Sequence, residues 1–293
     1  MKVTSFGEVL WDDFPSGKVL GGAPLNVLVR LQSLGVDCAI ISRRGDDADG
    51  VELLRQIRAK GVATGLIQVC DEQATSLVRV AIDDCGVARY DIVHPCAWDR
   101  IRIEPAALER VAASDAFIYG SLGARDEVSR RTLDQLLEVA TFKVFDVNLR
   151  PPHYTASRVQ ALMERADLIK LNDDELYELA RAFGSRLNSI EQNIRFIARH
   201  TRTPRICVTL GGHGAIYLKD DELYHHSGFR VRVADTVGSG DSFLAGLVYK
   251  LLNNVPPQES LNFACALGAL VASHRGATPE ISLQEIDAFM HPA

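Results

Sequence analysis

The sequence predicts an α/β protein in which a mostly parallel sheet is covered by helices on both faces. From Glu104 onward, short runs of apolar and β-branched residues alternate with amphipathic stretches, as expected of consecutive right-handed βαβ units. One segment, residues 62–98, breaks this alternation with several short strand patterns and no convincing helix. The chain of 293 residues is long enough for an α/β domain that carries a small additional sheet.

The individual elements follow from the spacing of the apolar residues. Strands are expected where apolar or β-branched residues run together, over 3–11, 39–42, 66–69, 76–83, 88–93, 116–120, 144–148, 168–171, 206–210 and 215–218. Helices are expected where apolar residues recur at helical spacing, over 23–34, 51–59, 104–113, 127–140, 173–182, 189–200 and in the stretch that follows Gly240.

The irregular segment has the features of a small β-structure that projects from the body. The residues Asp-Asp-Cys-Gly at 83–86 are typical of a hairpin turn. Together with residues 11–20, the segment 62–98 is expected to form a lid on a single domain that spans 1–293. Such a lid often covers a substrate. An additional hairpin at the edge of the main sheet is the alternative interpretation.

Composition and charge exclude several classes of protein. The chain has 32 Lys and Arg against 38 Asp and Glu, a net charge of −6, which argues against binding to nucleic acid. No apolar run reaches the length of a membrane span, and the first residues have no apolar signal core. The six cysteines are scattered without a CxxC pair, so we interpret them as buried thiols of a cytoplasmic protein.

A glycine-rich turn leads into a helical pattern at Gly238-Ser239-Gly240-Asp241. Glycines allow several backbone N–H groups to point toward one place, and a helix N-terminus adds partial positive charge. This combination predicts a site for an anion. A carboxylate at the same position, Asp241, could act as a general base for an attacking hydroxyl. An ordinary Asp N-cap after a flexible turn is the alternative.

A second glycine-rich turn, Gly21-Gly22, also opens a helical pattern. Asn26 lies about one turn into that helix, where its amide offers both a donor and an acceptor for a polyol. Asp12 follows the first expected strand, and strand ends are the usual place for ligand groups in open α/β sheets. A solvent-facing Asn26 and a solvated Asp12 in a turn remain the alternatives.

Other common nucleotide and metal motifs do not fit. No GxxxxGK[ST] sequence is present, which excludes a P-loop enzyme, and no HRD or DFG set points to a protein kinase. Gly238 and Gly240 could belong to a dinucleotide fingerprint, but Phe243 stands at the third glycine position. His225 and His226 form no ligand set with a Cys or carboxylate pair, so a protein-bound zinc is not expected.

The two glycine-rich stretches occur together with further motifs in a recognisable order. Residues 235–243, Asp-Thr-Val-Gly-Ser-Gly-Asp-Ser-Phe, and 21–26, Gly-Gly-Ala-Pro-Leu-Asn, are the two signatures. Between them lie 45–50 with Gly-Asp-Asp, 146–150 Asp-Val-Asn-Leu-Arg, 170–175 Lys-Leu-Asn-Asp-Asp-Glu and 209–214 Thr-Leu-Gly-Gly-His-Gly. Jointly these motifs resemble the PfkB, or ribokinase-like, carbohydrate kinases, and the resemblance covers nearly the whole chain.

The resemblance implies a ribokinase-like three-layer α/β/α body with a β lid. It implies transfer of the γ-phosphoryl group of ATP to a sugar hydroxyl. Asp241 would be the base, and the N–H groups of Gly238, Ser239 and Gly240 would form the anion hole. Phosphoryl transfer of this kind depends on positioning and charge stabilisation more than on covalent chemistry.

The resemblance also implies ligands for the nucleotide and for metal ions. Asn172 and Glu175 would help to place Mg²⁺, largely through water, and Lys170 would add positive charge near the phosphates. Thr209, Gly211 and Gly214 should lie along the nucleotide phosphates. A monovalent cation such as K⁺ is a further hypothesis, with ligands from Asp235, the Val237 carbonyl and carbonyls of the 271–277 loop, for which Val271, His274 and Gly276 are the candidates.

Within the family, residues 7–15 with 21–24, and 146–150 with 90–93, most resemble the fructokinases. D-Fructose phosphorylated at O6, to fructose 6-phosphate, is therefore the expected reaction. Asp12, Gly22 and Asn26 would hold sugar hydroxyls, and Arg150 would stand near the sugar or the transferring phosphoryl group.

Two alternatives to fructose phosphorylation stay open. One is a kinase for another sugar or sugar acid, such as ribose or 2-keto-3-deoxygluconate. The other is a sugar- or nucleotide-binding regulator without activity. The expected small-molecule partners are a monosaccharide and ATP. Since the edge strand of a lid can pair with that of a second copy, a homodimer through the lid is expected.

Overall fold

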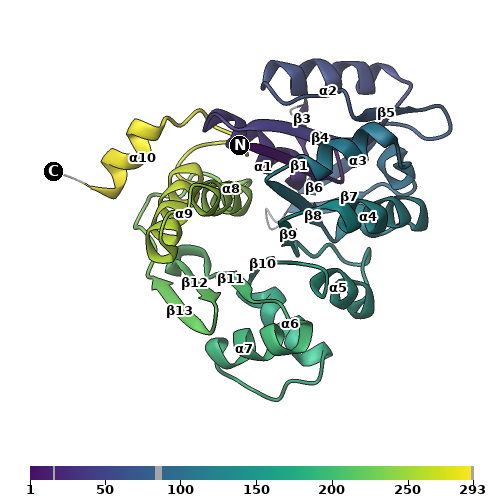
Figure 1. The fold of residues 1–293 in the computed structure, drawn as a ribbon. Helices are drawn as coiled ribbons and strands as arrows, with labels where there is room; N and C mark the ends of the chain where they lie inside the picture. The colour runs from purple at the N-terminus through teal and green to yellow at the C-terminus, as the bar shows by residue number, and fades with distance from the viewer. Residues whose placement is uncertain (16, 83–87, 292–293) are drawn as a thin grey trace.

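A nine-stranded sheet forms the centre of the computed structural model, which describes residues 1–15, 17–82 and 88–291 (Figure 1). In spatial order its strands are β13 (Glu222–His226), β12 (Ala215–Lys219), β11 (Arg205–Thr209), β10 (Leu168–Asn172), β9 (Lys143–Asp146), β8 (Ala116–Gly120), β1 (Lys2–Phe6), β4 (Asp37–Gly45) and β5 (Ile67–Cys70). The neighbours from β11 to β5 pair in parallel, whereas β12 and β13 are antiparallel. The predicted mostly parallel sheet is confirmed.

Helices cover both faces of this sheet (Figure 1). One face packs on α1 (Ala23–Ser33), α2 (Ala48–Ala59), α8 (Ser239–Leu252) and α9 (Pro257–Ala272). The other face packs on α3 (Pro105–Ala112), α4 (Glu127–Val139), α5 (Ala156–Met163), α6 (Asp173–Ala182) and α7 (Ile190–Thr201). Alternation along the strands separates the two cores, as β8 shows: Ile118 packs on the first face and Tyr119 on the second. The three layers confirm the predicted α/β/α body.

A second sheet projects from the body. It consists of β3 (Gly17–Gly21), β2 (Leu10–Phe14), β6 (Ser76–Ile82) and β7 (Ala88–Ile92), in that order. These strands come from the two segments predicted for the lid, and we call the sheet they form the lid sheet. The hairpin turn predicted at 83–86 lies outside the described residues.

Two strand predictions near the lid were wrong. The single strand expected over 3–11 is divided into β1 and β2, because Gly7, at φ +143°, turns the chain out of the main sheet. Asp12 therefore lies within the lid sheet rather than at the end of a body strand. The strand near 66–69 is β5, which pairs with β4 at the edge of the main sheet and is not part of the lid sheet.

The strict alternation expected after Glu104 holds only as far as α6, because a second helix, α7, follows before β11. The chain then forms two consecutive antiparallel strands, β12 and β13, joined at Asp220 and Asp221, both of which have positive φ as in a type I′ turn. It ends with three consecutive helices, α8, α9 and α10 (Leu283–Met290). Three helices, α5, α9 and α10, and strand β13 were missed by the pattern reading.

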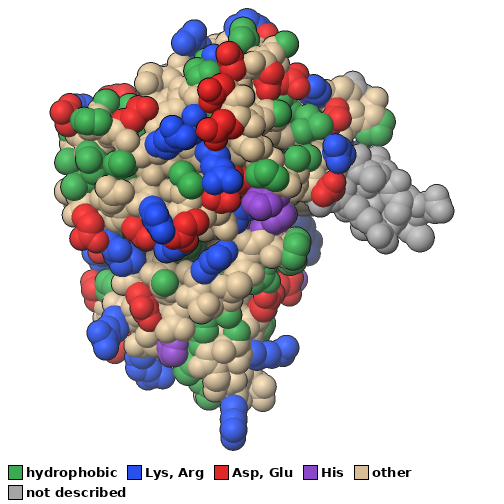
Figure 2. All heavy atoms as spheres, turned by 90° about the vertical axis from the view of Figure 1, so that its right-hand side faces the viewer, with side chains coloured by type: hydrophobic (Ala, Val, Ile, Leu, Met, Phe, Trp, Pro, Cys, Tyr) green, Lys and Arg blue, Asp and Glu red, His purple; other side chains and the backbone are tan. Residues whose placement is uncertain are grey.

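Two global expectations can be compared with the structure. In the described part of the chain, no helix is long and apolar enough to cross a membrane. The five cysteines within that part are buried and free of disulfides, as predicted. The face of the molecule shown in Figure 2 has acidic and basic side chains interspersed.

Candidate active site

The conserved geometry of open α/β sheets places ligands beyond the carboxyl ends of the strands, and the predicted site residues lie there. Strands β1, β9 and β10 end near the beginnings of α1 and α8, and β2 of the lid sheet continues from β1. This arrangement brings residues that are more than 200 positions apart in the sequence into contact. Asn26 of α1, for example, donates from Nδ2 to Oδ2 of Asp241 on α8 at 2.9 Å.

Asp241 occupies the first turn of α8, directly after the glycine-rich turn. Burial and the neighbouring Asp146 raise the pKa of Asp241, Lys170, Asn26 and Arg150 lower it, and together these effects bring it to about 6. A carboxyl group with this pKa is ionised at neutral pH and is a stronger base than an exposed aspartate. A carboxylate of raised basicity is therefore held in place by a hydrogen bond from α1.

The N-terminus of α8 is fixed by the neighbouring loop and by α9. Gly238 is the N-cap with φ +75°, and a Cβ at that position would lie 2.2 Å from the Ala277 carbonyl oxygen. Ser239 donates from Oγ to the Gly268 carbonyl at 2.9 Å, and its backbone N–H donates to the Thr236 carbonyl at 3.2 Å. Of the three amides predicted for the anion hole, that of Ser239 is therefore engaged in the turn. The amide of Gly240 belongs to the helix turn whose N–H groups have no intrahelical partner.

The residues predicted to hold the sugar include a carboxylate, Asp12, that lies close to a pair of glycines. Burial raises the pKa of Asp12 to about 6, and Arg150 lowers it. A Cβ on Gly21 would lie 2.4 Å from Oδ2 of Asp12, and a Cβ on Gly22, at φ +116°, would lie 2.5 Å from the Glu8 carbonyl oxygen. Both glycines thus allow the chain to pass close to these groups. The side chain of Arg150 is exposed, and its charge acts on Asp12, Asp241 and Glu8 alike.

Lys170 and Asp146 form a buried ion pair near Asp241, with Nζ of Lys170 3.0 Å from Oδ1 of Asp146. Burial disfavours the charge of Lys170, but Asp146, Glu175 and Asp241 together raise its pKa. A Cβ on Gly240 would lie 3.3 Å from Nζ, so the ammonium group reaches the first turn of α8. Sequence reasoning quoted Asp146 within a motif and assigned it no role.

A cavity of about 370 Å³ opens on the other side of the α8 N-terminus. The predicted residues Asn172, Thr209, Gly211, Gly214, Ser239 and Gly240 line it. Gly214 has φ +86°, and a Cβ there would lie 1.9 Å from the His226 carbonyl oxygen, so a side chain is excluded at this position. Sequence reasoning missed the apolar part of the cavity, whose residues include Phe229, Val231, Val233, Cys265, Ala269 and Ala272.

Asn172 and Glu175 form a capping box at the start of α6. Asn172 Oδ1 accepts from the Glu175 N–H, and Glu175 Oε2 accepts from the Asn172 N–H, each at 2.8 Å. Glu175 Oε1 accepts from the Leu149 N–H at 2.8 Å. Burial raises the pKa of Glu175, while Lys170 lowers it. Among the described residues no cluster of three His, Cys, Asp or Glu side chains could hold a metal ion. Asn172 and Glu175 could hold Mg²⁺ only through water molecules, around a metal ion that is itself bound to phosphate.

The predicted K⁺ ligands lie behind the N-terminus of α8 and do not line the cavity. Asp235 accepts from the Val237 N–H and from the Gly276 N–H, each at 3.0 Å, so it joins the turn before α8 to the 271–277 loop. The Val271 carbonyl accepts from the His274 N–H at 3.0 Å. The segments named for the cation are therefore held next to each other by Asp235.

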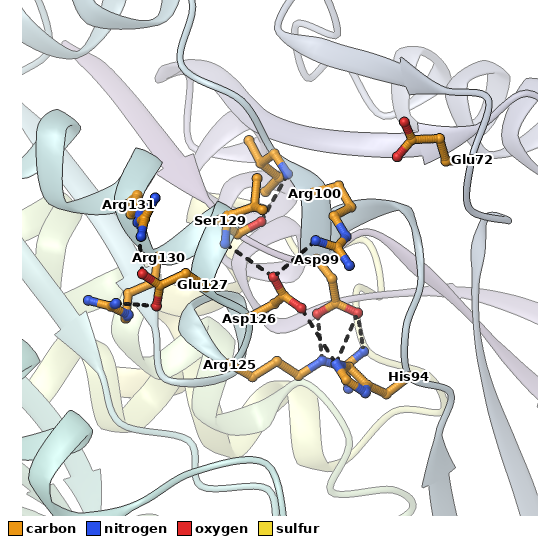
Figure 3. Close-up of polar contacts among 12 residues, drawn as sticks. Glu72, His94, Asp99, Arg100, Arg125, Asp126, Glu127, Ser129, Arg130 and Arg131 are labelled. Carbon is orange, nitrogen blue, oxygen red and sulfur yellow. Dashed lines mark hydrogen bonds and ion pairs between the residues drawn. The ribbon is translucent and has the colours of Figure 1, made fainter.

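A buried ion pair lies where the chain passes from the lid sheet back into the body. Figure 3 shows this pair together with its neighbours. Arg125 donates from Nε and Nη2 to the two carboxylate oxygens of Asp99 at 2.7 and 2.8 Å. Its Nη2 also donates at 2.8 Å to the carbonyl of Val93, which directly follows β7. The guanidinium lies 4.0 Å from the centre of the Trp98 ring. This pair fixes the end of the lid sheet to the start of α4.

Comparison with known proteins agrees with this geometry. The sequence profile of the pfkB family of carbohydrate kinases matches residues 12–283. The chain belongs to this family. It is 29% identical to fructokinase-2 of Solanum lycopersicum over 95% of this chain and 92% of that protein.

Solved structures show the same fold in relatives of this pfkB-family kinase. A fructokinase from Xylella fastidiosa with bound ATP is 25% identical, with a TM-score of 0.84 over 99% of this chain and 98% of that chain. A fructokinase from Vibrio cholerae O395 with bound fructose, ADP and calcium ion is also 25% identical, with a TM-score of 0.83 over 99% of both chains. The ribokinase-like fold predicted from the motifs is thereby confirmed.

Proposed function

We propose that this pfkB-family sugar kinase transfers the γ-phosphoryl group of ATP to O6 of D-fructose and so forms fructose 6-phosphate and ADP. The observation that supports this most strongly is the position of Asp241. It is half-buried in the first turn of α8, where it accepts a hydrogen bond from Asn26 of α1, and its neighbours Ser239 and Gly240 line the glycine-rich cavity. A base between an acceptor site and a nucleotide site is what in-line phosphoryl transfer requires.

The reaction follows from the chemistry of these groups. Asp12, Gly22 and Asn26 would orient the sugar, and Asp241 would take the proton of the acceptor hydroxyl. The oxygen then forms a bond to the γ-phosphorus as the bond to the β,γ-bridging oxygen breaks, and ADP leaves. Negative charge on the transferring group would be stabilised by the α8 N-terminus, from Gly238 to Gly240, and by Arg150.

The nucleotide would occupy the cavity between β11 and α9. Its phosphates would lie along Thr209, Gly211 and Gly214, and its base would contact the apolar residues near Phe229 and Ala269. Lys170 would bring positive charge to the phosphates through the first turn of α8. Asn172 and Glu175 would hold Mg²⁺ through water, and the metal would neutralise phosphate charge.

The choice of sugar is tested with a panel of acceptors and coupled detection of ADP. We expect clear turnover with D-fructose and much lower kcat/KM with ribose, glucose and 2-keto-3-deoxygluconate. No turnover with fructose but clear turnover with another acceptor would contradict the assignment to fructose. No turnover with any acceptor would favour a regulator that has kept the fold.

The same panel tests the proposed monovalent cation. We expect turnover to fall when K⁺ is replaced by tetramethylammonium, because Asp235 and the 271–277 loop adjoin the N-terminus of α8. Unchanged turnover would exclude a K⁺ requirement. A homodimer through the lid sheet is a separate proposal, since β3 and β7 are edge strands within the chain; sedimentation that gives a monomer would contradict it.

A further inference from the structure

Two buried acids, Glu8 and Asp146, line one small cavity with Gly120 at the end of the main sheet. Strand β8 lies between β1 and β9, with Phe6 opposite Tyr119 and Gly120 opposite Asp146. Glu8 follows β1 at the same end. By the alternation of strand residues, Gly120 has its side-chain position on the α1 face, as Ile118 does. A missing side chain at Gly120 therefore leaves space between Glu8 and Asp146.

That space is a small cavity of about 10 Å³, which is the room that one water molecule needs. Glu8, Gly120 and Asp146 line it, together with Ser121 and Asn148. Glu8 and Asp146 are only 3% and 4% exposed. Within the described residues, Glu8 Oε2 and Asp146 Oδ2 have no hydrogen-bond partner. Buried polar atoms without partners are costly, and an enclosed water is the usual way to satisfy them.

The charges around Glu8 come from several elements. Arg150 after β9 and Arg125 at the start of α4 favour its ionised form, whereas Asp241 on α8 disfavours it, and Asp146 stands across the cavity. Burial is the strongest influence and raises the pKa of Glu8 to about 7. The other carboxylate oxygen of Asp146, Oδ1, accepts a hydrogen bond from Nζ of Lys170. In its neutral form Glu8 can donate a hydrogen bond, and Oδ2 of Asp146 offers an acceptor.

We propose that one enclosed water bridges Glu8 Oε2 and Asp146 Oδ2, accepting a hydrogen bond from neutral Glu8 and donating one to Asp146, and that Glu8 is thereby a positioning residue for the base Asp241. When Glu8 ionises as the pH rises, it adds negative charge near Asp241 and makes that carboxylate a stronger base. The effect on turnover rests on the proposed function, whereas the bridge itself does not.

The bridge is tested by infrared titration of the buried carboxyl group. We expect wild-type protein to show a carbonyl band of protonated carboxylic acid whose last component disappears near pH 7, above the components of Asp12 and Asp241, and Glu8→Gln to lack that last component. Gly120→Ala places a Cβ in the cavity, where Asp146 O at 3.4 Å is its one neighbour within 4 Å, so we expect a folded protein without room for the water. Loss of that water should let the acid band persist to higher pH.

Matched variants separate this effect from general damage. Gly65→Ala, at a glycine with open space around it, and Glu109→Gln, at an exposed glutamate, should titrate like wild type. A titration unchanged by Gly120→Ala, or an acid component with its midpoint near pH 7 that remains in Glu8→Gln, would overturn the proposal. If Glu8→Gln does not fold, the comparison of Gly120→Ala with Gly65→Ala still decides.

A kinetic measurement tests the link to the base. In Glu8→Gln we expect kcat at about pH 8 to fall roughly 3- to 10-fold, with little change in KM for ATP, and the acid limb of the pH profile to move to lower pH. An acid limb that stays in place would overturn the role of Glu8 toward Asp241. A wild-type protein that titrates as expected but phosphorylates no acceptor would contradict the proposed function and leave the bridge intact.

Discussion

The two sides of the proposed active site use different groups: side chains on one side and main chain on the other. The proposed sugar side depends on side chains: Asn26 of α1 donates to Asp241 of α8, Asp12 comes from the lid sheet, and Glu8 lies buried close to Asp241. The nucleotide side depends on main chain and on missing side chains, since Gly211, Gly212, Gly214 and Gly228 line much of its polar part. On the first side, ionisable side chains are shielded from water. On the second side, glycine main chain surrounds the cavity.

This difference predicts different responses to substitution. Where function depends on an ionisable side chain, removing that group should reduce turnover and leave binding of the nucleotide intact. Where function depends on the path of the backbone, adding a single methyl group should be enough to reduce affinity. The predictions below test this contrast, beginning with the largest expected effect.

The largest effect is expected at the base. Asp241→Asn removes the proton acceptor and keeps the shape of the side chain, so turnover should fall by about 10²–10⁴-fold. The affinity for ATP, measured by calorimetric titration, should change little, because the nucleotide cavity lies on the other side of the helix N-terminus. Near-full turnover in this variant would remove Asp241 from its proposed role.

The next effect concerns stability and pH. The pKa of Glu8 is about 7 in the folded protein and near its ordinary value of 4.5 in the unfolded chain. A raised carboxyl pKa stabilises the fold fully below about pH 4.5, and this stabilisation is lost as the pH rises toward 7. The loss can reach about 3 kcal/mol for a buried group. Glu8→Gln does not titrate, so its free energy of unfolding relative to wild type should increase between about pH 5 and 8. A constant difference across this range would contradict the buried acid.

The nucleotide side is tested by a pair of neighbouring glycines. Gly214→Ala forces a Cβ to within 1.9 Å of the His226 carbonyl at a positive φ, which should cost roughly 1–3 kcal/mol and weaken ATP binding. Gly212→Ala has open space at the same loop and an ordinary φ, so its effect on unfolding should stay within about 0.5 kcal/mol. Equal losses in the two variants would show that the cavity depends on flexibility rather than on close backbone contact.

The glycine-rich motifs could be predicted from the sequence because their signal is local. Gly238 and Asp241 stand side by side, and their meaning as turn and helix start is contained in about ten residues. Glu8 carried no such signal, because its altered pKa arises from β8, β9 and α8, which lie more than 100 positions away in the sequence. Asp12 was misplaced for a related reason. The turn at Gly7 that sends it into the lid sheet depends on a backbone angle that glycine permits but does not require.

The missed helices have a physical explanation as well. α9 is apolar nearly all round, as a helix buried between β12, β13 and α8 must be, so its periodicity is weak. Val231 and Val233, which line the apolar part of the cavity, lie in an irregular segment that is hydrogen-bonded to that helix through Ala234 and Ala272. The spacing of apolar residues along one face therefore predicts the amphipathic helices at the surface, but it does not predict α9.

A crystal structure with D-fructose and a non-hydrolysable ATP analogue tests the role of Asp241 most directly. We expect the O6 hydroxyl within about 2.6–3.2 Å of an Asp241 carboxylate oxygen, with the γ-phosphate facing the first turn of α8. A complex in which Asp241 contacts neither the acceptor hydroxyl nor a position in line with the γ-phosphate would contradict its assignment as the base.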